Sequence, residues 1–255
     1  MGFKRYIKEG RGQGTGKDYV PWTKIHDFSS KGRATRIMGI KTGRIHHLHS
    51  DNQLRAFLTF EFNDNVIDIR ESYPLLDVME VIDHKENLRF DKFCDKETGE
   101  QLVICTNFVL TVIDADGNEI HVARTIKNSS KLDKRITFEK LEIERRYWEV
   151  KGVNWKVITD KQLPKQVANN LQWVRETLLE DSETGKEPLS DILHTHLLKN
   201  MDKQVKDVVK SFDQVEGIAT GTGLYLFRYL IAKKKLTVNM SEKINLGHKV
   251  KDILL

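Results

Sequence analysis

A glycine-rich segment near the start of the chain has the composition of a phosphate-binding loop. Glycines at positions 10, 12, 14 and 16 precede Lys17, and such loops can present backbone N–H groups to phosphates. A nucleotide-binding loop would require glycine in place of Arg11 and Ser or Thr in place of Asp18. The segment therefore favours a flexible arm that follows a phosphate backbone over an ATP site.

Potential metal ligands and thiols are few and poorly spaced. His46, His47 and His49 complete no ligand set at the usual spacings, so polar surface or DNA contact is their default interpretation. Cys94 and Cys105 match neither a C-x-x-C metal site nor a redox motif. We therefore expect no zinc finger and no disulfide framework, and a reducing compartment suits the chain.

The first 50 residues are strongly basic. They hold eleven Lys and Arg against three Asp and Glu, whereas the rest of the chain is slightly acidic. Cations that displace condensed counterions from a phosphate backbone gain binding entropy, which is typical of nucleic-acid-binding segments. We expect a basic N-terminal arm that contacts DNA through Lys8, Arg11, Lys17, Arg33, Arg36, Lys41 and Arg44.

The elements that must position such residues follow from local sequence patterns. Ser50 and Gln53 form a capping box, and apolar residues at helical spacing predict a helix that ends near residues 63–65. A second helix is expected over 136–150, with Phe138, Leu141 and Trp148 as its buried residues. Runs rich in β-branched residues predict strands over 66–70, 102–113, 120–127 and 154–159, the middle two joined as a hairpin.

This order of helix, three strands, helix and strand is compatible with the α/β core of the PD-(D/E)xK, or restriction-endonuclease-like, fold. In that fold two neighbouring strands present an acid and an acid-x-Lys pair. The carboxylates hold Mg²⁺ ions that activate a water, and the lysine orients the nucleophile or stabilises the transition state. Lys127 ends a predicted strand, where that lysine would lie.

Longer sequence strings are more specific than this spacing. The chain reads RYIKEGRGQGTGKDYVPW from Arg5, KTGRIHHLHSD from Lys41, VIDIRESYPLL from Val66 and FEKLEIERRYW from Phe138. In these strings it closely resembles the TnsA family of transposon-end endonucleases, strongly over residues 5–165 and more loosely beyond. The resemblance implies an enzyme that cleaves the 5′ ends of a mobile element. A DDE-type transposase, TnsB, would cleave the 3′ ends, and an ATPase, TnsC, would couple both to target DNA.

The resemblance also assigns site residues. Carried over position by position, the family's helix glutamate falls on Gln53, its strand aspartate on Asn107, and its Gln-x-Lys element on Thr125 and Lys127. Gln53, Asn107 and Lys127 are thus the expected catalytic positions, and Gln53, Asn107 and Thr125 the expected metal-binding positions. The family's acid-rich helix matches at Glu139, Glu142 and Glu144. This sequence departs from the family at both carboxylates and at Thr125.

The two amides are expected to weaken metal binding. Each is nearly the size of the carboxylate it replaces but carries no charge, and a unit-charge pair at ~4 Å contributes on the order of 4 kcal/mol at an effective dielectric of about 20. We therefore expect Mg²⁺, held as two ions in an acidic relative, to bind weakly here. The main-chain carbonyl of Thr125 could still ligate a hard cation. Such amides fit a naturally degenerate nuclease or introduced substitutions.

Two functions are compatible with these residues. The first is a transposition endonuclease subunit that binds transposon-end DNA, a TnsB-type transposase and a TnsC-type ATPase, and that does not cut as written. The alternative is a non-catalytic module that bridges the same partners. An RNA-binding protein is disfavoured because no signature of the common RNA-binding modules is present.

A second domain is expected after a link at residues 160–164, so that the chain divides into residues 1–162 and 163–255. Helices are predicted over 166–179, 189–200, 203–212 and 224–235, followed by a small hairpin of residues 236–239 and 244–246. This pattern suggests a mainly helical, winged-helix-like domain, whose recognition helix could enter a DNA groove. A docking platform for a protein partner fits the pattern equally well.

The composition is that of a soluble chain with a core. Of its 255 residues 39% are hydrophobic and 31% are charged. No stretch approaches the ~20 apolar residues of a membrane span, and the first residues lack the apolar region of a signal peptide. We expect a bacterial cytoplasmic protein without a membrane partner.

Overall fold

The computed structural model describes residues 2–27, 32–95, 97, 99–179 and 185–255. The chain forms two compact units, Met1–Leu163 and Pro164–Leu255. This division lies within the expected link at residues 160–164, one residue beyond the expected boundary between residues 162 and 163. Within the described residues, no helix is both long enough and apolar enough to cross a bilayer.

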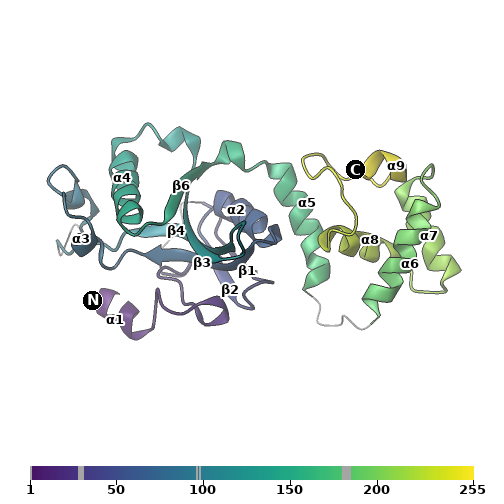
Figure 1. Ribbon diagram of the computed structural model, residues 1–255, viewed down its shortest axis with the longest axis horizontal. Coiled ribbons are helices and arrows are strands. Elements are labelled where there is room, and N and C mark those ends of the chain that lie inside the picture. The colour runs from purple at the N-terminus through teal and green to yellow at the C-terminus, as the bar shows by residue number, and fades with distance from the viewer. Residues whose placement is uncertain (1, 28–31, 96, 98, 180–184) are drawn as a thin grey trace. The chain divides into compact units, whose positions relative to one another are not determined.

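The first unit is built on a sheet of four strands in the order β3, β4, β5 and β6 (Figure 1). These are β3 (Val66–Pro74), β4 (Cys105–Ile113), β5 (Glu119–Lys127) and β6 (Asn154–Thr159). The first three are antiparallel and β6 is parallel to β5, so β6 must be reached by a crossover helix. All four predicted strands are present, and β3 continues four residues beyond its predicted end.

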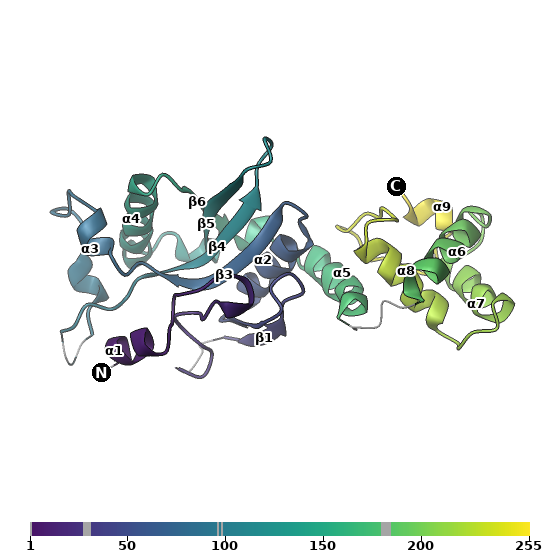
Figure 2. The same cartoon turned by 60° about the horizontal axis from the view of Figure 1, so that its bottom comes forward.

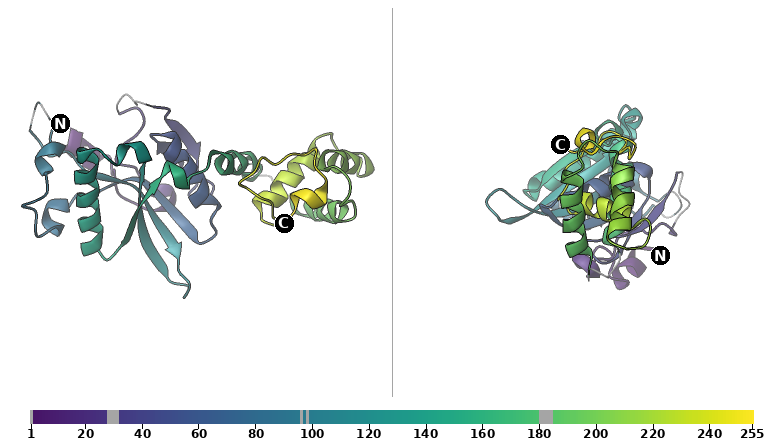
Figure 3. Two further views of the ribbon diagram at one scale, coloured as in Figure 1. Left: turned by 90° about the horizontal axis from the view of Figure 1, so that it is seen from above. Right: turned by 90° about the vertical axis from the view of Figure 1, so that its right-hand side faces the viewer.

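Two helices cover opposite faces of this sheet. Phe108 of β4 packs edge-on against Phe60 of α2 (Asp51–Phe62). The next residue, Val109, joins the core formed with Ile143 and Trp148 of α4 (Arg135–Val150). Successive side chains of a strand point to opposite faces, so α2 and α4 lie on different sides of the sheet, as Figure 3 also shows.

One buried residue of α4 was predicted wrongly. Phe138 was expected in the core, but its side chain is 65% exposed. The buried face of α4 instead begins at Leu141 and continues through Ile143, Tyr147 and Trp148. Phe138 lies on the first turn of the helix, before this buried face begins.

In its described residues, the basic N-terminal segment is folded and is not the flexible arm expected from the sequence. It contains α1 (Gly2–Lys8), a 3₁₀ turn at Gly16–Asp18 and the hairpin of β1 (Thr35–Met38) and β2 (Ile45–Leu48), seen in Figure 2. Tyr19 and Trp22 are buried, and Tyr19 donates a hydrogen bond to the Glu71 carbonyl. Gly12 has a φ of 76°, and a Cβ at this position would lie 2.3 Å from Pro74. The glycines therefore allow close packing against β3.

Short elements complete the first unit. They are α3 (Val78–Val81) and 3₁₀ turns at Phe90–Phe93, Ser129–Lys131 and Asp160–Gln162. The turn at Ser129–Lys131 follows β5 directly, and it therefore lies next to the end of the strand that carries Lys127.

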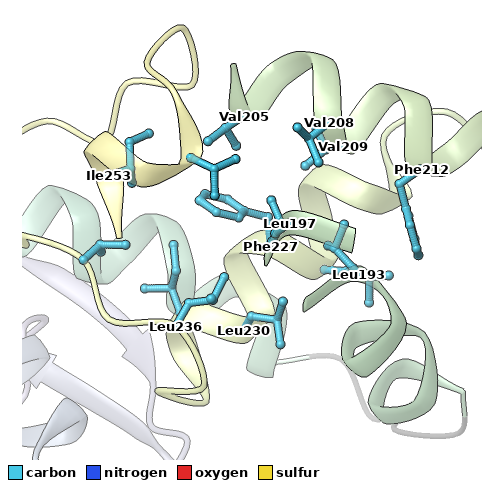
Figure 4. Close-up of a cluster of buried hydrophobic side chains, with 14 of the residues drawn as sticks. Leu193, Leu197, Val205, Val208, Val209, Phe212, Phe227, Leu230, Leu236 and Ile253 are labelled. Carbon is cyan, nitrogen blue, oxygen red and sulfur yellow. The ribbon is translucent and has the colours of Figure 1, made fainter. Parts of the chain in front are cut away.

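The second unit is mainly helical. Its helices are α5 (Lys165–Arg175), α6 (Lys186–Leu198), α7 (Val205–Val215), α8 (Thr222–Ala232) and α9 (Val250–Ile253), with a 3₁₀ turn at Glu176–Leu178. Their apolar faces meet in one core, in which Leu193 and Leu197 of α6, Phe212 of α7 and Phe227 of α8 are fully buried (Figure 4). The helices expected from the sequence are therefore present.

The small hairpin expected at residues 236–239 and 244–246 is not formed. Among the described residues of this unit, the only strand pairing consists of isolated bridges, which join Val238 to Leu254 and Gln204 to Lys249. The Asn170 side chain of α5 donates hydrogen bonds to the carbonyls of Met240 and Glu242. These carbonyls are satisfied by a side chain, so the loop does not need a partner strand.

Candidate active site

One cleft gathers residues from four separate segments of the first unit. Its volume is about 450 Å³. It is lined by Gly32, Arg33, Ser50, Asp51, Asn52, Gln53, Arg55, Asn107, Ile126, Lys127, Asn128 and Lys131. Three expected catalytic positions, Gln53, Asn107 and Lys127, therefore face a common space although they span 74 positions of the sequence.

Gln53 is placed by the start of α2. The Ser50 hydroxyl accepts a hydrogen bond from the Gln53 main-chain N–H at 3.2 Å, as the capping box predicts. The Gln53 side-chain oxygen then accepts from the main-chain N–H of His49 at 2.8 Å, one residue before the expected donor. Gln53 thus closes the turn that leads from β2 into α2, and its amide is held at the rim of the cleft.

Asn107 is placed by a bond across the sheet. Its side-chain oxygen accepts a hydrogen bond from the main-chain N–H of Ile126 at 2.7 Å. The ladder between β4 and β5 begins at the pair of Phe108 and Arg124, so Asn107 continues the connection with its side chain. This contact holds Asn107 beside Lys127.

Lys127 is the last residue of β5 and is mostly buried. Burial, together with repulsion from Lys140 and Lys131, lowers the pKa of its ammonium to about 8, and the charge of Glu144 opposes this effect. Among the described residues, none forms a hydrogen bond or ion pair with this ammonium. Lys127 is therefore a cation available to a ligand in the cleft.

Thr125 does not line the cleft. Its side chain is fully buried, where its hydroxyl donates to a carboxylate oxygen of Glu144 at 2.5 Å and accepts from the Trp155 indole at 3.0 Å. The hydroxyl is therefore not available as a metal ligand. A role for its main-chain carbonyl stays a prediction.

Glu144 is a buried anion directly behind the site. The same carboxylate oxygen accepts from Thr106 at 2.9 Å, and the other lies 3.4 Å from the Lys140 ammonium. Glu144 thus ties β4 to β5 through Thr106, one residue before Asn107, and Thr125, two residues before Lys127. The sequence contained a signal for this burial, because Glu144 lies three residues after Leu141 and four before Trp148, on one helical face.

Both parts of the chain match models of a known protein family. Residues 63–160 match the family model described as TnsA-like endonuclease N terminal, and residues 162–240 match that described as TnsA endonuclease C terminal. The chain is also 36% identical over 239 residues to the transposon Tn7 transposition protein TnsA of Escherichia coli, which covers 92% of this chain and 85% of that protein.

The chain belongs to the TnsA family. Its predicted family, its restriction-endonuclease-like α/β fold and its role as a transposition endonuclease subunit are thereby confirmed. Endonucleases of the TnsA type are generally dependent on divalent metal ions, so the donor atoms of the cleft have to be compared with the needs of such an ion.

The cleft of this TnsA chain does not fit a divalent cation. Within the described ranges, no three His, Cys, Asp or Glu side chains are grouped so that they could hold a metal ion. Among the lining residues Asp51 is the one acid, and it is exposed. The oxygens of Gln53 and Asn107 each already accept a main-chain hydrogen bond. A carboxylate would offer a second oxygen at each position, whereas the amide offers an NH₂ donor.

Two of the expected DNA-contacting residues are buried in this TnsA structure, and for them the prediction was wrong. Arg11 is 3% exposed and its guanidinium pairs with Asp27 at 2.5 Å. Arg44 is 8% exposed and pairs with both carboxylate oxygens of Glu71, at 2.9 and 2.6 Å. Neither guanidinium can reach a phosphate, because each is already neutralised inside the fold.

The remaining members of the expected DNA-contacting set differ in exposure. The ammonium of Lys41 donates to the carbonyls of Asn63 and Val66, and it thus joins the end of α2 to β3. The other four, Lys8, Lys17, Arg33 and Arg36, are exposed, and Arg33 lines the cleft. A DNA contact stays a prediction for these exposed residues.

The cluster around Glu71 also corrects the interpretation of the histidines. His46 is fully buried, with one ring nitrogen 2.8 Å from Glu71 and the other 2.7 Å from the Thr42 hydroxyl. Burial raises the pKa of Glu71, but the hydrogen bonds and charges of His46 and Arg44 outweigh this and lower the pKa to about 2. His46 is therefore part of a buried ionic network and not of a polar surface.

Proposed function

We propose that this chain is a TnsA-type subunit of a transposition complex that holds transposon-end DNA in its cleft but does not cleave it. The observation that carries the proposal is the position and hydrogen bonding of two side-chain amides. Gln53 and Asn107 stand at the expected acid positions, and each uses its one oxygen to accept a main-chain N–H. The positions and their scaffold are thus kept while the negative charge is missing.

The loss of charge is large enough to disable metal binding. Each carboxylate facing a cation at ~4 Å contributes on the order of 4 kcal/mol at an effective dielectric of about 20, and about 1.4 kcal/mol is tenfold in affinity. Two missing carboxylates therefore weaken Mg²⁺ binding by orders of magnitude, even after a discount for desolvation. Lys127 alone cannot supply the charge neutralisation that hydrolysis of a phosphodiester requires.

The partners belong to the same proposal. We infer a DDE-type transposase of the TnsB kind, an ATPase of the TnsC kind and the ends of a mobile element as its binding partners. The support is the family membership and the Escherichia coli relative, whose name describes a transposition protein of Tn7.

The decisive experiment restores the acids. We expect Gln53→Glu together with Asn107→Asp to give Mg²⁺-dependent cleavage of 5′ transposon ends in the presence of the transposase partner, while the parent gives none. Lys127→Ala in the restored background serves as the matched control and should abolish cleavage again. Cleavage by the unaltered chain would overturn the proposal.

Isothermal titration with Mg²⁺ or Mn²⁺ distinguishes this proposal from the alternative, a non-catalytic DNA-binding and bridging module. Under our proposal the restored variant binds the ion and the parent does not. If the restored variant is folded but still neither binds metal nor cuts, the bridging function explains the chain better.

A further inference from the structure

Among the described residues, four cations from three segments of the chain line the cleft. Arg33 precedes β1, Arg55 lies in α2, Lys127 ends β5, and Lys131 lies in the 3₁₀ turn that follows. In the part of the chain that the structure describes, none of them forms an ion pair, and Arg55 makes one long hydrogen bond, 3.4 Å, to the Leu163 carbonyl. The cleft therefore has an excess of positive charge, opposed among its lining residues by Asp51.

The polar groups between these cations are also donors. The oxygens of Gln53 and Asn107 each accept a main-chain hydrogen bond, and their NH₂ groups remain as donors toward a ligand. The first turn of α2 lines the same cleft, where the N–H groups of Asp51 and Asn52 have no partner within the helix and that of Gln53 donates to the Ser50 hydroxyl. Cations, amide donors and a helix start together favour an anion over a cation.

We propose that this cleft binds a DNA backbone phosphate directly, without a divalent cation, and that Arg55 and Lys131 are phosphate contacts in addition to Lys127 and Arg33. The inference rests on the proposed function and deepens it, because it states how DNA is retained where the metal would otherwise bridge protein and phosphate. The cations come from three segments around the cleft, so they suit a chain of phosphates better than one free phosphate ion.

The placement of the cations supports this assignment. Lys127 and Lys131 both line the cleft, and a bound phosphate would offset the repulsion between their ammonium groups. The neutral amides act in the same direction, since carboxylates at Gln53 and Asn107 would repel a phosphate in the absence of a metal ion.

The test measures binding of a labelled transposon-end duplex by fluorescence anisotropy in EDTA and in Mg²⁺ at matched ionic strength. The parent should bind equally well in both. Arg55→Ala with Lys131→Ala should weaken binding roughly 10- to 100-fold and lower the slope of log affinity against log salt by about 2. Lys156→Ala, an exposed cation on β6 outside the cleft, is the control and should change little.

Restoring the acids provides a reciprocal test. Gln53→Glu with Asn107→Asp should bind the duplex at least tenfold more weakly than the parent in EDTA, and Mg²⁺ should recover that loss. The proposal is overturned if the parent needs Mg²⁺ to bind, if the restored variant binds as tightly as the parent in EDTA, or if Arg55→Ala with Lys131→Ala behaves like Lys156→Ala.

Two further outcomes matter. One distinguishes free phosphate from the DNA backbone as the anion in the cleft, and the other distinguishes failure of the anion site from failure of the proposed function. Strong competition by millimolar inorganic phosphate, with no effect of the Arg55 and Lys131 variants on the duplex, would assign the cleft to free phosphate and overturn the DNA contact. Because the assay contains no transposase and measures no cleavage, the anion site can fail while the chain still proves unable to cut. The converse result, cleavage by the parent, would overturn the proposed function through a separate measurement.

Discussion

The side-chain oxygen of Asn107 in β4 lies 2.7 Å from the main-chain nitrogen of Ile126 in β5, the residue before Lys127. One side chain thus has two roles, since it extends the sheet and lines the cleft. An acid at this position could make the same bond with one oxygen and use the other for a ligand. The geometry therefore explains how an amide can keep the architecture of the site without its charge.

Substitutions of Asn107 should separate these roles. Asn107→Asp keeps the acceptor for Ile126 and should cost less than about 1 kcal/mol of unfolding free energy. Asn107→Ala leaves that N–H without its partner and should cost about 1–3 kcal/mol. Urea unfolding curves of both variants measure the difference, and equal losses would show that the bond to Ile126 does not stabilise the sheet.

Glu144 is expected to be a major stabilising residue of the sheet. Its removal in Glu144→Ala leaves the hydroxyls of Thr106 and Thr125 without their acceptor and Lys140 without its ion-pair partner, and should cost roughly 3–5 kcal/mol. A double-mutant cycle with Thr125→Val should give a coupling of about 1–3 kcal/mol. Glu149→Ala on the same helix, where the carboxylate is 67% exposed, should cost below about 0.5 kcal/mol. A coupling near zero would exclude a stabilising bond between Thr125 and Glu144.

The buried network of Glu71 should make stability fall at low pH. The folded-state pKa of about 2 lies below the ordinary value of 4.5, so the charged form stabilises the fold fully above pH 4.5. This contribution, on the order of 3 kcal/mol, is lost as the pH falls from about 4.5 through 2. Unfolding free energies of the parent and Glu71→Gln should therefore converge over this range. A constant difference between them would contradict the assignment.

Replacing a buried basic residue of the N-terminal segment should lower stability, whereas replacing an exposed one should lower DNA affinity. Arg11→Ala removes a guanidinium that also donates to the Trp22 carbonyl, and it should cost about 3–5 kcal/mol of stability. The exposed Lys8 and Lys17 should instead lower DNA affinity when replaced by Ala, with a salt slope reduced by roughly 0.9 for each lost phosphate contact. Unchanged DNA binding by the Lys8 and Lys17 variants would place this surface against a protein partner.

Lys127 should destabilise the free protein at neutral pH. Its pKa of about 8 lies below the ordinary 10.5, so the fold favours the neutral amine, and stability from this group rises as the pH increases from 8 to 10.5. Lys127→Met should therefore be more stable than the parent at pH 7, by up to about 3 kcal/mol, and the gain should vanish near pH 10.5. Thermal unfolding with the exposed Lys156→Met as control measures this, and a variant less stable than the parent at pH 7 would contradict it.

The regular elements were predictable because their causes are local. The bounds of β6 and the start of α2 follow from hydrophobic alternation and from the capping pair of Ser50 and Gln53. The grouping of Gln53, Asn107 and Lys127 depended on the resemblance, since no local pattern shows that positions 74 residues apart share a cleft.

The incorrect or missed predictions concern residues whose burial or position depends on partners that are distant in the sequence. Arg44 appears in the sequence as one basic residue among many, and its burial depends on Glu71, a partner 27 positions away. Arg55 and Lys131 were missed as cleft residues for the same reason, because only the folded sheet brings the start of α2 next to the turn after β5. A count of charges measures the net charge of a segment, but it does not show which charges reach solvent.

The start of α2 has a practical consequence for anyone who wishes to shorten this protein. The matched endonuclease region begins at residue 63, one position after α2 ends. An expression clone trimmed to that limit would discard Gln53 and Arg55 and would strip the aromatic cover from Phe108. More than half of the residues that line the cleft would be lost, and an apolar surface of the sheet would be exposed to solvent. Any minimal version of the nuclease unit therefore has to start well upstream of the recognisable domain.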